Sequence, residues 1–586
     1  MRTLCSAIAA IVLSSCALSA QDGLPPKDGL TALTLPAGFS IQLVAAEPGI
    51  TQPVAYCTDD RGRLWILENK SYPDCPGKPE NRIVILEDEK GDGTSWKSTV
   101  FVDNLTFATG IQVGFGGVYV GAPPNLLFIP DKDYDGKPDG PPQTVLDGFG
   151  WEDTHETLNN FTWGPDGWLY GTHGVFTNSK VGVPGTPADK RVKINAGVWR
   201  FHPTTKQFEL YCEGASNQWG IDWNDQGQAF FTACVIPHLY HAIQGGRYRR
   251  QAGQHFNQYT YADIQEIAKF KYERAAYCGS LVYLGGLFPA EYRNTLFFND
   301  IHMSKVRHEA LVREGSGFIN EKRPDFVVSS DSWFRTLSPQ YGPDGSLYLN
   351  DWFDKVHCHQ QKAETDRSNG RFYKISYTGV KPARPDLQKA SDSELVKMQL
   401  DQNDWYVRHA RRVLQERGPK PAVHAELAKI LNGNPDETRK LRALWALHAT
   451  QGLTETIALA QLKSPAEYVR AWTIQLLCEG GKPSAAALAA FAGLAKDDPS
   501  AAVRLYLASA LQRIPLESRW EIANALAAHE EDNGDRNLPL MIWYGIEPAV
   551  PGARKQALAL AKTAKITKVR EFIAKRLGGA QSGDEE

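Results

Sequence analysis

The sequence contains no Cys-x-x-Cys-His, the motif that attaches c-type haem, so covalent haem is not expected. Beyond its first 20 residues it has no apolar run long enough to span a bilayer. A basic excess is also missing, because 64 Lys and Arg stand against 67 Asp and Glu, a formal net charge of −3. Nucleic acid is therefore not an expected partner, and small molecules or proteins are favoured.

A turn cassette repeats through the first two thirds of the chain. Gly164-Pro165-Asp166-Gly167-Trp168-Leu169-Tyr170 returns almost unchanged as Gly342-Pro343-Asp344-Gly345-Ser346-Leu347-Tyr348, and looser copies begin at Asp60, Gly114 and Asp225. Asp bonds its own backbone and Gly accepts positive φ, so each copy predicts a tight turn that feeds a buried strand. The spacing of about 50 to 60 residues predicts a six-bladed β-propeller, and we expect these turns to locate its mouth.

The chain changes character near Pro382, where Ala- and Leu-rich text with helical spacing replaces the Gly-aromatic turns. A second repeat appears there, in which a hydrophobic-Arg pair opens an amphipathic helix, with the arginines at Arg408, Arg442, Arg470, Arg504 and Arg570. This pattern predicts a HEAT-like solenoid, and an irregular helical domain is the alternative. We therefore divide the chain into an all-β propeller at residues 21–380 and an all-α HEAT-like solenoid at 381–580, which would serve as scaffold or docking surface.

Residues 1–20 have the form of a signal peptide, with Arg2 at the start, an apolar stretch from Leu4 to Leu13 and small residues after it. They predict export to the periplasm or cell envelope. Leu13-Ser14-Ser15-Cys16 resembles a bacterial lipobox, so Cys16 would carry a lipid anchor; simple secretion is the alternative. In an oxidising compartment Cys57 and Cys75 are the pair we expect to form a disulfide.

The sharpest chemical motif is the stretch from Asp131 to Asp139, which places carboxylates around a glycine turn at Asp131, Asp133, Asp135 and Asp139. Converging hard oxygen ligands of this kind bind calcium, although the glutamate that closes an EF-hand is missing. We predict a short Ca²⁺-binding hairpin with a structural role, and an acidic turn without an ion is the alternative.

Two histidine patterns suggest further chemistry. His155 and Asp153 form the most credible acid–base pair, because a carboxylate can orient a nearby imidazole; a structural His–Asp bond is the alternative. His357-Cys358-His359 offers transition-metal ligands, but alternation along a strand would point Cys358 away from the two histidines.

Four short motifs in the propeller half carry a family resemblance. They are Leu35-Pro36-Ala37-Gly38-Phe39, Gly148-Phe149-Gly150, Asp351-Trp352-Phe353-Asp354 and Asp366-Arg367-Ser368-Asn369-Gly370-Arg371. From about residue 30 to residue 380 the chain resembles the membrane-bound dehydrogenase propellers of planctomycetes and verrucomicrobia. Many members of that family end in a cytochrome c domain, whereas this sequence ends after the helical repeats. The resemblance implies electron transfer to a separate carrier, such as a cytochrome that docks on the solenoid.

Cys278-Gly279-Ser280-Leu281-Val282-Tyr283 is similar, more distantly, to a strand of the soluble quinoprotein glucose and sorbosone dehydrogenases. That resemblance implies pyrroloquinoline quinone and calcium at the propeller mouth. His155 would be the base that takes a sugar hydroxyl proton, with Glu156 competing for the same slot. Asn217, His302 and Arg335 would hold the cofactor or substrate. Ser216 stands where the family has arginine, which weakens the expectation of quinone binding.

Two functions follow as hypotheses. The first is oxidation of a carbohydrate or polyol hydroxyl by an exported propeller. The second is a non-catalytic carbohydrate- or protein-binding scaffold, in which the mouth recognises a ligand without turnover.

Overall fold

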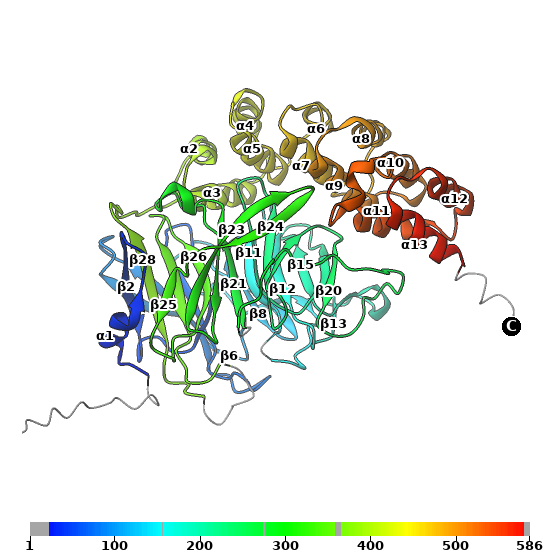
Figure 1. The fold of residues 1–586 in the computed structure, drawn as a ribbon. Helices are drawn as coiled ribbons and strands as arrows, with labels where there is room; N and C mark the ends of the chain where they lie inside the picture. Colours follow the sequence, from blue (N-terminus) through cyan, green and yellow to red (C-terminus); the bar gives the residue numbers. More distant parts are fainter. Residues whose placement is uncertain (1–22, 155, 274–275, 358–364, 579–586) are drawn as a thin grey trace, which may run out of the picture.

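The computed structural model describes residues 23–154, 156–273, 276–357 and 365–578. Their strands form six blades around one axis, and helices cover one end of that axis (Figure 1). Among these residues no helix is both long enough and apolar enough to cross a membrane. The predicted signal peptide and the predicted lipidation site, Cys16, lie outside the described residues.

The blades follow one another along the chain. Blade 1 contains β3 (Pro53–Thr58), β4 (Leu64–Glu68), β5 (Asn81–Asp88) and β6 (Trp96–Leu105). Blade 2 contains β7 (Gly110–Val113), β8 (Gly117–Ala122), β9 (Asn125–Pro130) and β10 (Gln143–Asp147). Blade 3 contains β11 (Asn159–Trp163), β12 (Leu169–His173), β15 (Gly197–Phe201), β16 (Phe208–Ala215) and β20 (Arg247–Arg250), with the hairpin β13 (Ser179–Val181) and β14 (Val192–Ile194) beside it.

The remaining blades carry the additions. Blade 4 contains β17 (Asn217–Trp223), β18 (Ala229–Cys234) and β19 (Leu239–Ala242). Blade 5 contains β21 (Tyr277–Val282), β22 (Thr295–Asp300), β23 (Lys305–Glu314) and β25 (Val327–Ser329), extended by β24 (Gly317–Lys322) and β1 (Leu33–Thr34). Blade 6 contains β26 (Thr336–Tyr341), β27 (Leu347–Asp351), β28 (Arg371–Tyr377) and β2 (Phe39–Ala46).

The ring is closed by a strand from the start of the chain. β2 pairs antiparallel with β28, with Phe39 opposite Tyr377 and Ala46 opposite Arg371, so the first long strand completes the last blade. The innermost strands β3, β7, β11, β17, β21 and β26 contact one another in sequence, and β26 contacts β3. This closure leaves no exposed innermost edge among the described strands.

The repeated cassettes have one geometry, because each is the turn between the first and second strands of a blade. In blade 3 the Gly164 amide donates to the Trp168 carbonyl at 2.8 Å, Asp166 accepts from the Trp168 amide, and Gly167 has φ 83°. The turn of blade 6 repeats these bonds around Asp344, with Gly345 at φ 78°. Positive φ explains glycine at this position.

The helical region is a two-layer stack. The first layer contains α2 (Asp392–Lys397), α4 (Pro421–Gly433), α6 (Glu455–Gln461), α8 (Ala485–Asp497), α10 (Arg519–Leu526) and α12 (Arg554–Thr563). The second contains α3 (Asp404–Arg417), α5 (Glu437–Ala449), α7 (Glu467–Leu477), α9 (Ala501–Ala510), α11 (Leu538–Ile546) and α13 (Thr567–Gly578). Consecutive helices of the second layer contact one another, so the stack grows in one direction (Figure 1).

The hydrophobic-Arg repeat marks the second layer. Arg470 of α7 pairs with Asp498 at 2.7 Å, and Arg504 of α9 pairs with Asp532 at 2.6 Å, each reaching the segment that precedes the next helix of the layer. These ion pairs fasten one repeat to its neighbour.

The prediction of an all-β six-bladed propeller followed by an all-α solenoid is confirmed. The closer assignment to HEAT repeats stays a prediction.

The second layer of the solenoid faces the propeller and covers the cassette turns. Gln415 of α3 donates to the Gly167 carbonyl at 3.1 Å, and Trp472 of α7 donates to the Gln226 carbonyl at 3.0 Å. Tyr544 of α11 donates to the Ala262 carbonyl at 2.6 Å. The cassette end is therefore the solenoid interface, and the expectation that these turns locate an open mouth is wrong. This face of the solenoid is already occupied by its own propeller.

Candidate functional site

Two cavities lie on the propeller axis, one at each end. A hydrogen bond of 2.9 Å from the Ser338 hydroxyl to Asn160 Oδ1 joins the innermost strands of blades 3 and 6 between them. The cavity at the cassette end, of about 110 Å³, is lined by the inner strands and by Trp405, Arg408, His409 and Arg412 of α3. We call it the solenoid-side chamber.

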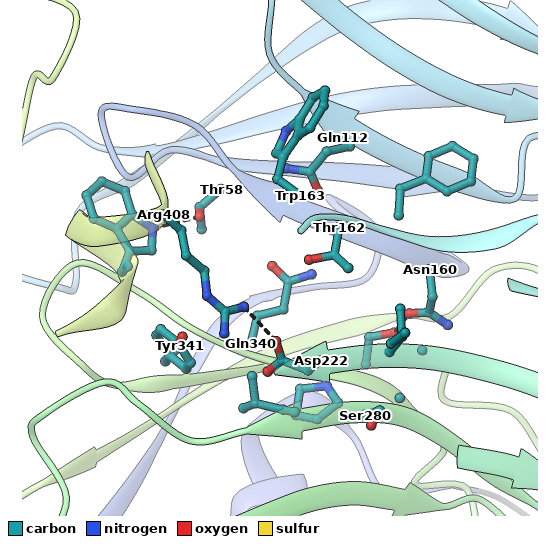
Figure 2. A pocket seen from close by; sticks show the side chains of 18 of the residues that line it. Thr58, Gln112, Asn160, Thr162, Trp163, Asp222, Ser280, Gln340, Tyr341 and Arg408 are labelled. Carbon is teal, nitrogen blue, oxygen red and sulfur yellow. Dashed lines mark hydrogen bonds and ion pairs between the residues drawn. The ribbon is translucent and has the colours of Figure 1, made fainter. Parts of the chain in front are cut away.

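The solenoid-side chamber is capped by α3. In Figure 2, Arg408 points from α3 into the chamber and meets Asp222 of β17 across it, at 2.6 Å. Arg408 also pairs with Asp404 one helical turn earlier, at 2.6 Å. Arg412 and His409 bind Asp60 of the blade 1 turn from the same helix. These buried ion pairs fix α3 over this end of the propeller axis, so the solenoid-side chamber is part of the domain interface.

The second cavity, at the end of the axis away from the solenoid, is larger, about 270 Å³. We call it the mouth pocket. All six blades line it, and its wall contains Val54, Asn69, Tyr72, Phe107, Thr109, Thr154, Thr157, Asn159, Trp219, Cys234, Val235, Ala276, Tyr277, Cys278, Ile301, His302, Leu337, Trp352 and His357. A pocket to which every blade contributes is the usual position of a propeller ligand site.

The wall of the mouth pocket is aromatic and uncharged. Five of the residues that line it are Tyr, Phe or Trp, and the polar residues are amides, hydroxyls and imidazoles. Trp352 packs edge-on against Tyr72, with ring centroids 5.2 Å apart, and its indole nitrogen donates to Gln52. Among the described residues that line the pocket, none is Asp, Glu, Arg or Lys. The arrangement suits a neutral ligand with both apolar faces and hydroxyl groups.

Two imidazoles lie side by side in this wall. His302 follows β22, His357 follows β27, and their ring centroids are 4.0 Å apart with an interplanar angle of 51°. Imidazole can accept or donate a proton near neutral pH, so this pair provides acid–base groups inside the pocket.

A buried carboxyl group lies behind the same end of the propeller. Glu156 precedes the pocket residue Thr157, is fully buried, and accepts a hydrogen bond through Oε1 from the Phe176 amide, while Oε2 has no partner among the described residues. Burial, followed by the charge of Asp153, raises the pKa of Glu156 to about 8, against the opposing amides of Phe176, Val175 and Thr177. The raised pKa favours the neutral, protonated form of Glu156 beside the mouth.

Comparison with known proteins gives a family for the propeller half. The family model described as a domain of unknown function, DUF7133, matches residues 25–379, more than half of the chain. The chain belongs to this family. The DUF7133 region thus includes all six blades, and the solenoid follows it. No curated protein matches the chain.

Solved structures that match the DUF7133 region do so at low identity. A glucose dehydrogenase-type oxidoreductase from Thermus thermophilus is 16% identical, with 58% of this chain and 100% of that chain covered and a TM-score of 0.41. The PQQ-bound aldose sugar dehydrogenase of Streptomyces coelicolor is 14% identical, with coverages of 58% and 99% and a TM-score of 0.40. The PQQ domain of pyranose dehydrogenase from Coprinopsis cinerea is 12% identical, with coverages of 59% and 97% and a TM-score of 0.38. Likeness of this degree assigns no substrate or cofactor.

The sequence-predicted site residues of the DUF7133 propeller do not all converge on the mouth pocket. His302 lines it. Asn217 begins β17 and accepts from the Val175 amide at 3.4 Å, in the loop that also binds Glu156. Asp153 is held through its backbone by Thr177, and its neighbour Thr154 lines the pocket. His155 lies outside the described residues.

Arg335 does not line the mouth pocket. Its Nη1 donates to the Ser304 hydroxyl at 2.9 Å and to the Phe334 carbonyl at 3.1 Å, and the side chain is buried. Burial lowers the pKa of this arginine, against the charges of Asp351 and Asp354. It serves the packing between blades 5 and 6.

The mouth pocket does not fit pyrroloquinoline quinone. The quinone carries three carboxylates, which require Arg or Lys donors in fixed positions. Within the described residues the pocket wall offers neither, and Arg335 is engaged by Ser304 and Phe334. Arg274 and Lys362, two cations close along the chain to pocket residues, lie outside the described residues.

Sequence reasoning missed the aromatic wall. Trp219 lies in β17, two residues after Asn217, and Tyr72 lies in the loop after β4. Only Trp219 carried a usable signal, because it lies at the mouth end of an innermost strand. His357 lines the pocket, whereas Cys358 and His359 of the predicted metal triplet lie outside the described residues.

Two further predictions concern the cassette end and the cysteines. Asp131, Asp133 and Asp139 bring carboxylate oxygens within 4.8 Å of one another in the β9–β10 loop, whereas Asp135 pairs instead with Lys137 at 2.8 Å. Cys57 and Cys75 are both free, so the predicted disulfide is wrong. Cys57 lies buried inside β3 opposite Trp65, where its side chain packs in the sheet core.

Proposed function

We propose that the protein binds a neutral carbohydrate or polyol in the mouth pocket. The observation that carries this proposal is the uncharged aromatic wall, to which Trp219 and Tyr72 contribute partly exposed rings beside the partly exposed polar residues Thr154, His302 and His357. A sugar presents C–H faces that pack on aromatic rings and hydroxyls that exchange hydrogen bonds with polar side chains.

A direct binding measurement tests this proposal. We expect Trp219→Ala to weaken binding of a sugar or polyol at least tenfold, because truncation removes a partly exposed ring from the pocket wall. Isothermal titration calorimetry across a panel of neutral sugars and polyols provides the measurement. The matched control is Phe256→Ala, an aromatic that is 52% exposed in a loop that contacts the solenoid. Absence of binding to every panel member by the unmodified protein would refute the proposal.

Oxidation of the bound hydroxyl is a second candidate function, which the imidazole pair of His302 and His357 favours. An imidazole, or the proposed His155–Asp153 pair, would take the hydroxyl proton. The carbon that bears the hydroxyl would lose a hydride to a dissociable two-electron acceptor, which is thereby reduced and then passes its two electrons to a carrier such as a cytochrome. We infer no role for pyrroloquinoline quinone in this step, because the described wall offers it no cationic partner.

Dye reduction separates the two functions. Sugars that bind are incubated with the protein and an artificial electron acceptor, with and without added quinone and Ca²⁺. Reduction that depends on the sugar supports a dehydrogenase; binding without reduction supports a recognition scaffold.

We propose export to the cell envelope for either function, with Cys16 as the lipid anchor. Globomycin-sensitive processing of the full chain checks that assignment.

A further inference from the structure

Three carboxylates converge in the loop between β9 and β10 of blade 2. Oxygens of Asp131, Asp133 and Asp139 all lie within 4.8 Å of one another. The loop folds around Gly136, at φ 88°, and its ends are joined by hydrogen bonds from the Asp139 amide to the Pro130 carbonyl and from the Lys132 amide to Asp139 Oδ2 at 2.6 Å. The backbone thus holds the three acidic side chains together against their mutual repulsion.

Asp131 is the member that points to a ligand. Its side chain belongs to a residue only 1% exposed, Oδ2 accepts from the Gly136 amide at 3.3 Å, and Oδ1 has no hydrogen-bond partner among the described residues. A buried carboxylate oxygen without a partner is costly, and a bound cation removes that cost. Asp133 and Asp139 are exposed, so they can approach an ion from the solvent side.

We propose that the β9–β10 loop binds one Ca²⁺ ion through Asp131, Asp133 and Asp139 and thereby fastens α3 to the propeller. The ligand atoms that the loop offers are all oxygen, which selects a hard cation over zinc or copper. Calcium tolerates the irregular geometry of a surface loop, whereas magnesium demands a near-ideal octahedron. Asp135 stays outside the set, paired with Lys137 in solvent.

The connection to α3 runs through Tyr134, which stands between two of the acidic residues. Its hydroxyl donates to Glu416 Oε2 of α3 at 3.0 Å and accepts from the Gly116 amide at 3.0 Å. Its carbonyl accepts from Arg63 Nη2 at 3.0 Å, and its backbone has φ 57°. An ion that holds the loop in this conformation also holds the Tyr134 hydroxyl against the helix that caps the channel.

The experiment uses the full chain after removal of divalent ions by chelation. Ca²⁺ binding is measured by calorimetry, and Tb³⁺ luminescence excited through the adjacent Tyr134 reports the same site. Asp133→Asn and Asp139→Asn are the test variants, because both side chains are exposed and the fold does not depend on burying them. Asp92→Asn is the matched control, since Asp92 lies in a second acidic turn of blade 1 and is satisfied by Thr94 and Ser95.

We expect one Ca²⁺ per chain with a dissociation constant between about 10⁻⁶ and 10⁻³ M. Each test variant should weaken binding at least tenfold, the double variant should abolish it, and the control should bind as the unmodified protein does. Hydrogen exchange of α3 should slow when Ca²⁺ is added and should not respond in the double variant. Absence of binding up to about 10 mM, or binding that survives the double substitution, overturns the site. Binding that leaves α3 exchange unchanged overturns its role in fastening the helix.

Discussion

The Arg200→Leu variant should lose about 3–5 kcal/mol of unfolding free energy, because the substitution leaves buried carboxylates without their cation. Arg200 in β15 is 1% exposed and pairs with Asp166 of the blade 3 cassette at 2.9 Å. It also pairs with Glu479 after α7 at 3.0 Å and with Glu209 of β16 at 2.7 Å. The Arg200 guanidinium therefore neutralises carboxylates of both the propeller turn and the solenoid that covers it.

Denaturant unfolding followed by tryptophan fluorescence measures this loss. Arg249→Leu is the control, since the Arg249 side chain is 46% exposed and pairs with Glu266 at 3.0 Å. The change expected for this control is within about 0.5 kcal/mol. The loss of unfolding free energy in Arg200→Lys should lie between those of Arg200→Leu and Arg249→Leu. Lysine keeps the positive charge but lacks the planar guanidinium that binds several carboxylates at once. Equal losses from Arg200→Leu and Arg249→Leu would contradict the importance of this buried network.

Glu156→Gln should stabilise the protein at high pH and have little effect at low pH. The pKa of Glu156 is raised from 4.5 to about 8 in the folded chain, chiefly by burial. Between these values the folded state keeps a proton that the unfolded chain has lost, so the stability contributed by the protonated carboxyl is fully present below 4.5 and disappears as the pH rises through 8. Each pKa unit corresponds to about 1.36 kcal/mol, which makes the whole effect roughly 5 kcal/mol.

The measurement compares the free energies of unfolding of the two proteins from about pH 4.5 to about pH 9. Glutamine keeps the Oε1 acceptor for the Phe176 amide and cannot ionise, so the variant should exceed the parent by roughly 5 kcal/mol at about pH 9 and match it near about pH 4.5. Glu321→Gln, at an exposed position of β24, is the control for a generic loss of charge. A constant difference across the pH range would show that Glu156 ionises normally in the folded protein.

The fold could be predicted from local sequence because the turn and helix motifs that indicate it recur along the chain. The Gly-Pro-Asp-Gly turns around Gly167 and Gly345 require positive φ, and this requirement is visible in the residues themselves. The hydrophobic-Arg pairs at Arg470 and Arg504 likewise mark helices whose arginines meet Asp498 and Asp532. Both signals depend on contacts within a few tens of residues, which a linear reading can follow.

The candidate site was harder to predict because its residues meet across all six blades. Trp219, Trp352 and His357 share the mouth pocket although they come from separate parts of the chain, and nothing local to each residue indicates the meeting. Asn217 and Arg335 were predicted to hold a ligand, yet Val175 and Ser304 engage them. The sequence also did not indicate which end of the propeller axis stays open, because that depends on where the solenoid docks.

The sequence by itself determined the propeller, the solenoid that follows it and the acidic loop at Asp131, since turn chemistry, helical periodicity and ligand spacing are local properties. Only the tertiary structure decided that α3 closes the cassette end and that the uncharged pocket lies at the opposite end. The physical reason is that ring closure and domain docking join residues hundreds of positions apart. Ion pairs such as Asp60 with Arg412 bury their charges only after both domains have folded.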